Sequence, residues 1–153
     1  MNRVYLSLGS NLGDKPFNLL QAIVYIVNKT GKISAISSVY ETKPSGFESL
    51  NNFLNMMVCV ETLLLPDELL SITQSIEKMI GRRNKSIHSY QDRLIDIDII
   101  AYNDLIINSE NLQLPHPLFH KRRFVLEPFN EIAPDYIHPV LKKKVSELLE
   151  DAT

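Results

Sequence analysis

Apolar and polar residues alternate along four stretches of this 153-residue chain, the period that a half-buried β-strand requires. These stretches are residues 4–8, 33–40, 53–62 and 95–102. Two further stretches repeat apolar residues every three or four positions, which is typical of amphipathic helices. The helical stretches begin near Pro16 and Pro66 and end at Gly31 and Gly81. In chain order the pattern predicts strand, helix, strand, strand, helix, strand.

This β-α-β-β-α-β order is that of a ferredoxin-like α+β sandwich. We therefore expect an antiparallel sheet with two helices on one face, and the other face free for a site. The remaining chain is less regular: an extended segment over 112–118, short helical turns over 117–129 and a last helix over 145–149. We interpret it as an irregular C-terminal extension. No repeat or linker divides the chain, so we expect a single domain spanning 1–153.

The composition narrows the class of protein. Apolar residues make up 44% and charged residues 22%, which is typical of a soluble globular chain. The formal net charge of −2 argues against nucleic-acid and membrane partners, so any basic site must be local. The single cysteine, Cys59, excludes an internal disulfide and a cysteine-built zinc site. With no signal peptide and no long apolar run, we expect a cytoplasmic protein, and a monomer.

The last predicted strand carries two acids, Asp96 and Asp98, which share one face because side chains two apart on a strand point the same way. The opposite face is expected to hold Ile95, Ile97, Ile99 and Ala101. Two carboxylates at this spacing repel each other, and a hard divalent cation such as magnesium would relieve the repulsion. The alternative is an exposed strand with two incidental acids.

Two other polar pairs could contact a ligand. Phe53 and Asn55 also lie two apart on one strand, which suits a flat heterocycle that stacks on the ring and hydrogen-bonds the amide. Gln74 and Glu77 lie three apart on the second helix and could contact a nucleotide base or sugar. The alternatives are an ordinary strand with a satisfied Asn and a solvated helix face.

Two basic segments flank the acidic strand and would suit a polyphosphate, although such segments are often only solvated. Their cationic and titratable residues are Arg82, Arg83, Lys85, His88 and Arg93 in the first, and His116, His120, Lys121, Arg122 and Arg123 in the second. The segment between Gly9 and Gly13 lacks the lysine of a phosphate-binding loop, and no HExxH zinc pattern is present. These residues together predict a magnesium–polyphosphate site beside a planar-ligand site.

A set of motifs runs nearly from end to end of the chain. They occupy residues 5–13, 40–42, 53–55, 77–82, 92–99, 114–117, 122–128 and 131–134. Two of them are Asp92-Arg93-Leu94-Ile95-Asp96-Ile97-Asp98-Ile99 and Leu114-Pro115-His116-Pro117. In this order they resemble the 6-hydroxymethyl-7,8-dihydropterin pyrophosphokinase family of folate biosynthesis.

The resemblance implies transfer of a pyrophosphoryl group from ATP to the hydroxymethyl oxygen of the pterin, with release of AMP. Asp96 and Asp98 would then hold two magnesium ions, and Arg82 and Arg93 would stabilise charge on the phosphates. The pterin pocket would comprise Thr42, Phe53, Asn55 and Phe124, with the two rings sandwiching the pterin. The ATP side would comprise Gln74, Glu77, Arg82, Arg93, His116 and Arg122.

The chain departs from the family pattern just before the acidic strand. Relatives often have Trp-Gly-Pro-Arg where this chain has Tyr90-Gln91-Asp92-Arg93, and arginines where it has Asn84 and His88. Two other classes stay open: a non-enzymatic RNA-binding or regulatory module, and a kinase that forms ADP on another hydroxymethyl heterocycle. An RNA-binding module should carry paired aromatics on its central strands, and this chain does not.

Overall fold

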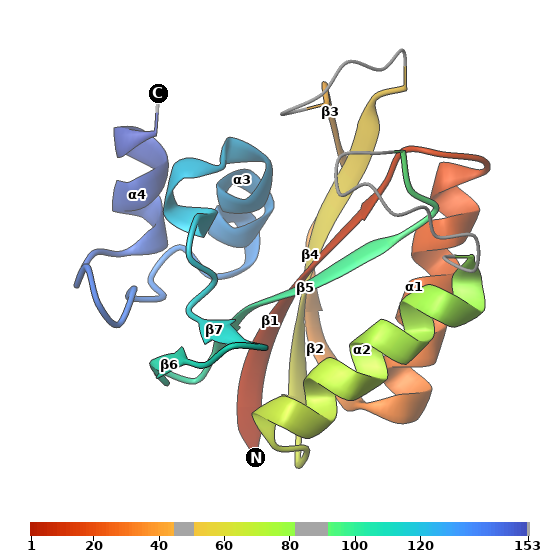
Figure 1. Ribbon diagram of the computed structural model, residues 1–153. Coiled ribbons are helices and arrows are strands. Elements are labelled where there is room, and N and C mark those ends of the chain that lie inside the picture. The colour runs from red at the N-terminus through yellow and green to blue at the C-terminus, as the bar shows by residue number, and fades with distance from the viewer. Residues whose placement is uncertain (45–50, 82–91, 153) are drawn as a thin grey trace.

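The computed structural model describes residues 1–44, 51–81 and 92–152 (Figure 1). Arg82, Arg83, Asn84, Lys85, His88, Tyr90 and Gln91 fall outside these ranges. The first part of the chain contains β1 (Asn2–Ser10), α1 (Lys15–Lys29), β2 (Gly31–Ile36), β3 (Tyr40–Thr42), β4 (Phe53–Thr62) and α2 (Pro66–Ile80). The second part contains β5 (Asp96–Tyr102), β6 (Ile107–Asn108), β7 (Gln113–Leu114), the turn η2 (Phe119–Lys121), α3 (Arg123–Ile132) and α4 (Val145–Asp151).

The main sheet has the strand order β2-β4-β1-β5, with β3 paired to the first residues of β4. Each of these pairings is antiparallel, and β1 lies in the centre between β4 and β5. The predicted ferredoxin-like order is therefore confirmed. The expected strand over 33–40 is divided in two, because β2 ends at Ile36 and β3 begins at Tyr40.

The two long helices begin and end where their local signals place them. Asp14 caps α1, its Oδ1 accepting a 3.1 Å hydrogen bond from the Phe17 amide. At the start of α2, Glu68 Oε1 accepts from the Leu65 amide at 2.8 Å. Gly81 follows the last turn of α2, and a side chain there would collide with Leu94, just upstream of β5. This close contact brings the end of α2 against the entry to the acidic strand.

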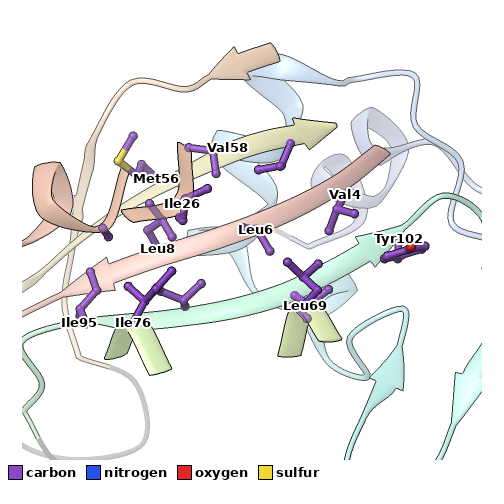
Figure 2. Packing of buried hydrophobic residues seen from close by; sticks show 14 of the residues in the cluster. Val4, Leu6, Leu8, Ile26, Met56, Val58, Leu69, Ile76, Ile95 and Tyr102 are labelled. Atoms are coloured by element: carbon purple, nitrogen blue, oxygen red, sulfur yellow. The ribbon is translucent and has the colours of Figure 1, made fainter. Parts of the chain in front are cut away.

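One face of the sheet packs against α1 and α2 and forms the larger core (Figure 2). The strands contribute residues at alternate positions, including Val4, Leu6 and Leu8 from β1 and Met56 and Val58 from β4. Helices α1 and α2 contribute residues such as Ile26, Leu69 and Ile76. All of these side chains are buried, so the alternation predicted for β1 and β4 is confirmed. None of the helices in the described ranges is long and apolar enough to cross a bilayer.

The second face of the sheet is not left free, as the sequence pattern led us to expect. Helices α3 and α4 pack over it, visible as a separate layer beside the strands in Figure 1. Phe119, Leu126 and Phe129 are fully buried there against Tyr5 and Met57. The segment we expected to form short turns contains a ten-residue helix, α3, despite the internal Pro128. Among the described residues of this face, Asp98 of β5 stays exposed, so this part of the face is open to a ligand.

A β-bulge in β5 corrects the predicted facing of Ala101. Tyr5 pairs with Ala101 whereas Leu6 pairs with Ile99, so Ile100 is an extra residue in the ladder. Ile97 and Ile99 therefore join the larger core, as expected, but Ile100 and Ala101 both belong to the second one. The bulge therefore changes which face of the sheet the side chains after Ile99 occupy.

Candidate active site

The open part of the second face is formed by the first residues of β4 and β5 and the last of β1. In this antiparallel register Gly9 pairs with Asn55 on one side and Asp96 on the other. In the next row, Ser7 pairs with Met57 and Asp98. The amide and the first carboxylate thus lie on either side of a residue without a side chain. A Cβ at Gly9 would lie 3.0 Å from Asn55 Oδ1 and 3.6 Å from Phe53 Cδ1, so glycine keeps this floor low.

Asp96 and Asp98 point to this face, as predicted, and cations surround them. Arg93 Nη1 lies 3.2 Å from Asp96 Oδ1, in an ion pair across three residues. Solvent reaches Asp98, yet the protein crowded around its carboxylate raises its pKa above the ordinary value. Arg122 and Arg93 act in the opposite direction and lower the pKa of Asp98. Both arginines therefore lie close enough to influence this carboxylate.

His116 lies next to Asp98 because the bulge in β5 presents a backbone acceptor to it. The His116 amide donates a 2.9 Å hydrogen bond to the carbonyl of Ile100, the extra residue. Asp98 and His116 then line the same hollow, of about 300 Å³, together with the β5 edge at Ile97 and Ile99. Leu70 of α2 closes another side of this hollow. An acid and an imidazole thus face a cavity floored by the edge of β5.

The imidazole of His116 is neutral at physiological pH. Burial, reinforced by the nearby Arg122, lowers its pKa to about 4. Its Nδ1 accepts a 3.3 Å hydrogen bond from the Leu118 amide, so the remaining proton is assigned to Nε2. His116 is therefore a neutral hydrogen-bond donor. The Leu114–Pro115 peptide bond just before it is cis.

Three of the predicted planar-ligand residues, Thr42, Phe53 and Asn55, come together on two paired strands, and the fourth, Phe124, lies on a helix. Thr42 pairs with Phe53 and Tyr40 with Asn55 between β3 and β4. Asn55 is buried, and its Nδ2 donates a 2.6 Å hydrogen bond to Thr42 Oγ1. Phe124 lies in the first turn of α3, with the Arg122 guanidinium carbon 5.6 Å from its ring centroid. Arg122 therefore links the aromatic residue to the acidic strand.

Gln74 and Glu77 lie on α2, four and seven residues after Leu70 and therefore on a similar flank. Gln74 is exposed, whereas Glu77 is buried and its Oε2 accepts a 2.8 Å hydrogen bond from the Ile97 amide. Because β5 is an edge strand, this bond satisfies a backbone donor on its outer side. Glu77 thus supports the acidic strand from the helix side.

Sequence reasoning missed two hydrogen-bonded groups of residues near the ends of the site strands. Asn11, Asn51 and Asp92 form a hydrogen-bonded cluster at the ends of β1, β4 and β5. Glu131 of α3 accepts from Ser38 and from Tyr40 Oη, the latter at 2.7 Å, which lowers the pKa of its carboxyl. Both groups join residues that lie 40 or more positions apart in the sequence, so no local pattern reveals them.

The fold and this site define an α+β enzyme with an acidic strand, two arginines near its carboxylates, a hollow lined by Asp98 and His116, and a buried amide. The family of 7,8-dihydro-6-hydroxymethylpterin-pyrophosphokinases (HPPK) matches residues 5–134. The chain belongs to this family. It is 42% identical over 153 residues to the 2-amino-4-hydroxy-6-hydroxymethyldihydropteridine pyrophosphokinase of Aquifex aeolicus, covering 100% of this chain and 94% of the relative.

A second relative supports the assignment, and a solved structure supports the fold. The enzyme of the same name from Porphyromonas gingivalis (strain ATCC 33277) is 44% identical over 138 residues, which cover 89% of this chain and 93% of the relative. Among solved structures, the fold is similar to that of Plasmodium falciparum HPPK-DHPS, with a TM-score of 0.78 and 19% identity. That alignment covers 98% of this chain and 44% of the Plasmodium chain. At this low identity the likeness supports the fold alone.

Proposed function

We propose that this chain transfers the pyrophosphoryl group of ATP to the hydroxymethyl oxygen of 6-hydroxymethyl-7,8-dihydropterin, releasing AMP. The observation that carries the proposal is the cross-strand row of Asn55, Gly9 and Asp96. It puts a group that can recognise a heterocycle and a group that can hold a metal ion on either side of a single strand, β1. A transferred phosphoryl group must lie between these two partners.

Magnesium is the metal that Asp96 and Asp98 fit. Magnesium in nucleotide sites is usually bound by one or two carboxylates, substrate phosphates and water. Within the described ranges no three His, Cys, Asp or Glu side chains form a metal cage, so phosphate oxygens would complete the coordination. Two magnesium ions, held by Asp96 and Asp98 together, are part of the proposal. Bound magnesium would neutralise charge on the triphosphate.

The pterin would lie over Gly9, with its ring between Phe53 and Phe124. The buried side chain of Asn55 supplies both an acceptor and a donor, which suits the amide-like edge of a pterin. Thr42 holds the Asn55 amide in place through the 2.6 Å hydrogen bond. Because Arg122 lies over the Phe124 ring, it contacts the proposed pterin pocket as well as the proposed phosphate site.

ATP would occupy the hollow beside β5 and extend its phosphates toward Asp98. His116, neutral and protonated on Nε2, can donate a hydrogen bond without adding charge. Arg93 and Arg122 lie close enough to Asp98 to lower its pKa, and the same two side chains would neutralise the phosphates. Gln74 and Glu77 would contact the nucleotide from α2. Arg82, outside the described ranges, keeps its proposed place on the ATP side.

In this proposal catalysis is alignment plus charge neutralisation, as in other phosphoryl transfers. No described side chain is assigned as a general base. The pterin hydroxyl would attack the β-phosphorus while the α–β bridge oxygen leaves with AMP. The whole chain would act as one domain, a monomer in the cytoplasm.

Incubation of the protein with ATP, magnesium and the dihydropterin tests the proposal. AMP and pterin diphosphate in equal amounts are the expected products. Formation of ADP would instead identify a kinase that transfers one phosphate. If no turnover occurs but the pterin binds, the chain is a binding module and the proposed reaction is wrong.

A further inference from the structure

Three side chains join the ends of β1, β4 and β5, and we call them the strand-end junction: Asn11, Asn51 and Asp92. Asn11 follows β1, Asn51 precedes β4 and Asp92 precedes β5. The Asp92 carboxylate accepts from both amides, through Oδ1 from Asn11 Nδ2 at 2.7 Å and through Oδ2 from Asn51 Nδ2 at 3.0 Å. Asn11 is 81 positions and Asn51 is 41 positions from Asp92 in the sequence, and both are bonded to its carboxylate.

Asn11 transmits this restraint to the backbone of Arg93. Its Oδ1 accepts a 2.7 Å hydrogen bond from the Arg93 amide, while its own backbone amide donates to the Arg93 carbonyl at 3.0 Å. Asn11 is only 1% exposed, so water does not readily replace these bonds. Because Asp92 fixes Nδ2 of the Asn11 amide, it also fixes the direction of Oδ1 toward Arg93.

The junction has an active-site residue on each side. Arg93 Nη1 reaches Asp96 Oδ1 at 3.2 Å, next to the proposed metal site. Phe53, the proposed stacking ring, begins β4 two residues after Asn51. A second restraint holds the same turn, since Lys15 Nζ donates to the Asn52 carbonyl at 3.0 Å. The junction therefore joins the phosphate side of the site to the pterin side.

We propose that Asp92 is a positioning residue for pyrophosphoryl transfer, which orients Arg93 through Asn11 and the start of β4 through Asn51. The inference rests on the proposed function for its kinetic consequence. Asp92 stands where relatives often have proline. Proline offers no side-chain acceptor, so the hydrogen bonds from Asn11 and Asn51 to position 92 require the Asp of this chain. The Asp92 carboxylate would then fix the position of the proposed phosphate site relative to the proposed pterin site.

Replacement of Asp92 by Asn gives a sharp test because the two side chains have the same shape. A side-chain amide has one acceptor and one donor, whereas both partners at this position are donors. The Asn11 amide is held by its bond from the Arg93 N–H, so it must still donate to position 92, and Asn51 must either face an N–H group or turn its amide over to accept. We expect D92N to lower kcat about tenfold or more, because both hydrogen bonds lose their charged acceptor and the Asn51 bond is broken or reversed.

The double variant D92N/N51D reverses the polarity of one bond and restores the pairing. The amide introduced at position 92 can accept from Asn11 through its oxygen and donate to the new carboxylate at position 51. We expect the double variant to regain most of the lost kcat. D104N serves as the matched control, since Asp104 is an exposed acid beyond β5, and its kcat should equal that of the unaltered protein.

Hydrogen exchange at the Arg93 amide provides a readout that needs no turnover. D92N should speed exchange there about tenfold or more, and N51D added to it should slow exchange again. Unchanged exchange and kcat in D92N would overturn the inference, as would a double variant no better than D92N. A failure of the proposed function would differ, since the unaltered protein would then form no AMP while the exchange pattern still tests the junction.

Discussion

Asn55 and Thr42 face each other across β4 and β3, with 2.6 Å between Nδ2 and Oγ1. This bond fixes which end of the buried amide is left to meet a ligand. Replacement of Thr42 by Val keeps the shape but removes the acceptor, so the amide can rotate. We expect T42V to weaken dihydropterin binding about fivefold, in keeping with one hydrogen bond between neutral groups. Isothermal titration with the pterin measures this, and an equal loss of ATP affinity would contradict it.

Asp98→Asn should abolish turnover while leaving pterin binding largely intact. The amide keeps the volume of the carboxylate but lacks the charge that holds magnesium against the phosphates. We expect a loss of at least about 100-fold in kcat, the scale on which electrostatic groups in active sites act. AMP release and pterin titration are measured side by side, with Asp104→Asn as the charge control. Retained activity in Asp98→Asn would refute the metal assignment.

Gly9→Ala should raise the KM for the pterin with little change in the KM for ATP. The added methyl would lie 3.0 Å from Asn55 Oδ1 and 3.6 Å from Phe53, in the floor of the proposed pterin pocket. We expect an increase of about tenfold or more, because even one misplaced methyl group obstructs a close-packed site. Steady-state kinetics with each substrate varied in turn separates the two values. An increase for ATP alone would mean that the pterin lies elsewhere.

The stability of the fold should fall as the pH is lowered through about 6.5, in part because of His138. His138 is buried, its Nδ1 accepts from the amides of Val140 and Leu141, and burial lowers its pKa. The unfolded chain therefore takes up the proton at a higher pH than the folded chain, and acid favours unfolding.

His138→Asn isolates this contribution, because Asn retains an acceptor for the same turn but does not titrate. Urea unfolding at pH 8 and pH 5.5 should show a smaller loss of stability in the variant than in the unaltered protein. Because the His120 ring lies 5.9 Å from that of His138 and the two influence each other's charge, the comparison measures His138 together with its effect on His120. An identical pH dependence would show that His138 does not contribute.

The order of the elements could be predicted from the sequence because alternation and helical periodicity are local properties. The bounds of β4 and α2 follow directly from their hydrophobic pattern, and Asp14 marks the start of α1 as a capping residue should. The facing of Ala101 could not be predicted, since the bulge at Ile100 depends on pairing with β1. The pattern indicates only short helical turns over 117–129, and the full length of α3 could not be predicted because it depends on the packing of Leu126 and Phe129.

The candidate site follows the same division. Asp96, Asp98, Phe53 and Asn55 could be placed on one face from their spacing in the strands alone. The neutral state of His116 could not, because it depends on burial beside Arg122. Asp92 carries no local signal either, since its partners Asn11 and Asn51 come from distant segments. Strand faces can be inferred from a period, whereas contacts between loops require the folded chain.

The bulge at Ile100 makes β5 intolerant of changes in length. The seven residues of this strand face the helical core, the open site or the C-terminal layer, and the unpaired residue Ile100 lies where the alternation between these faces shifts. Deletion of Ile100 would leave Ala101 and Tyr102 on their present faces, but it would remove the carbonyl that accepts the hydrogen bond from the His116 amide. Variation of this strand in evolution should therefore proceed by substitution rather than by insertion or deletion.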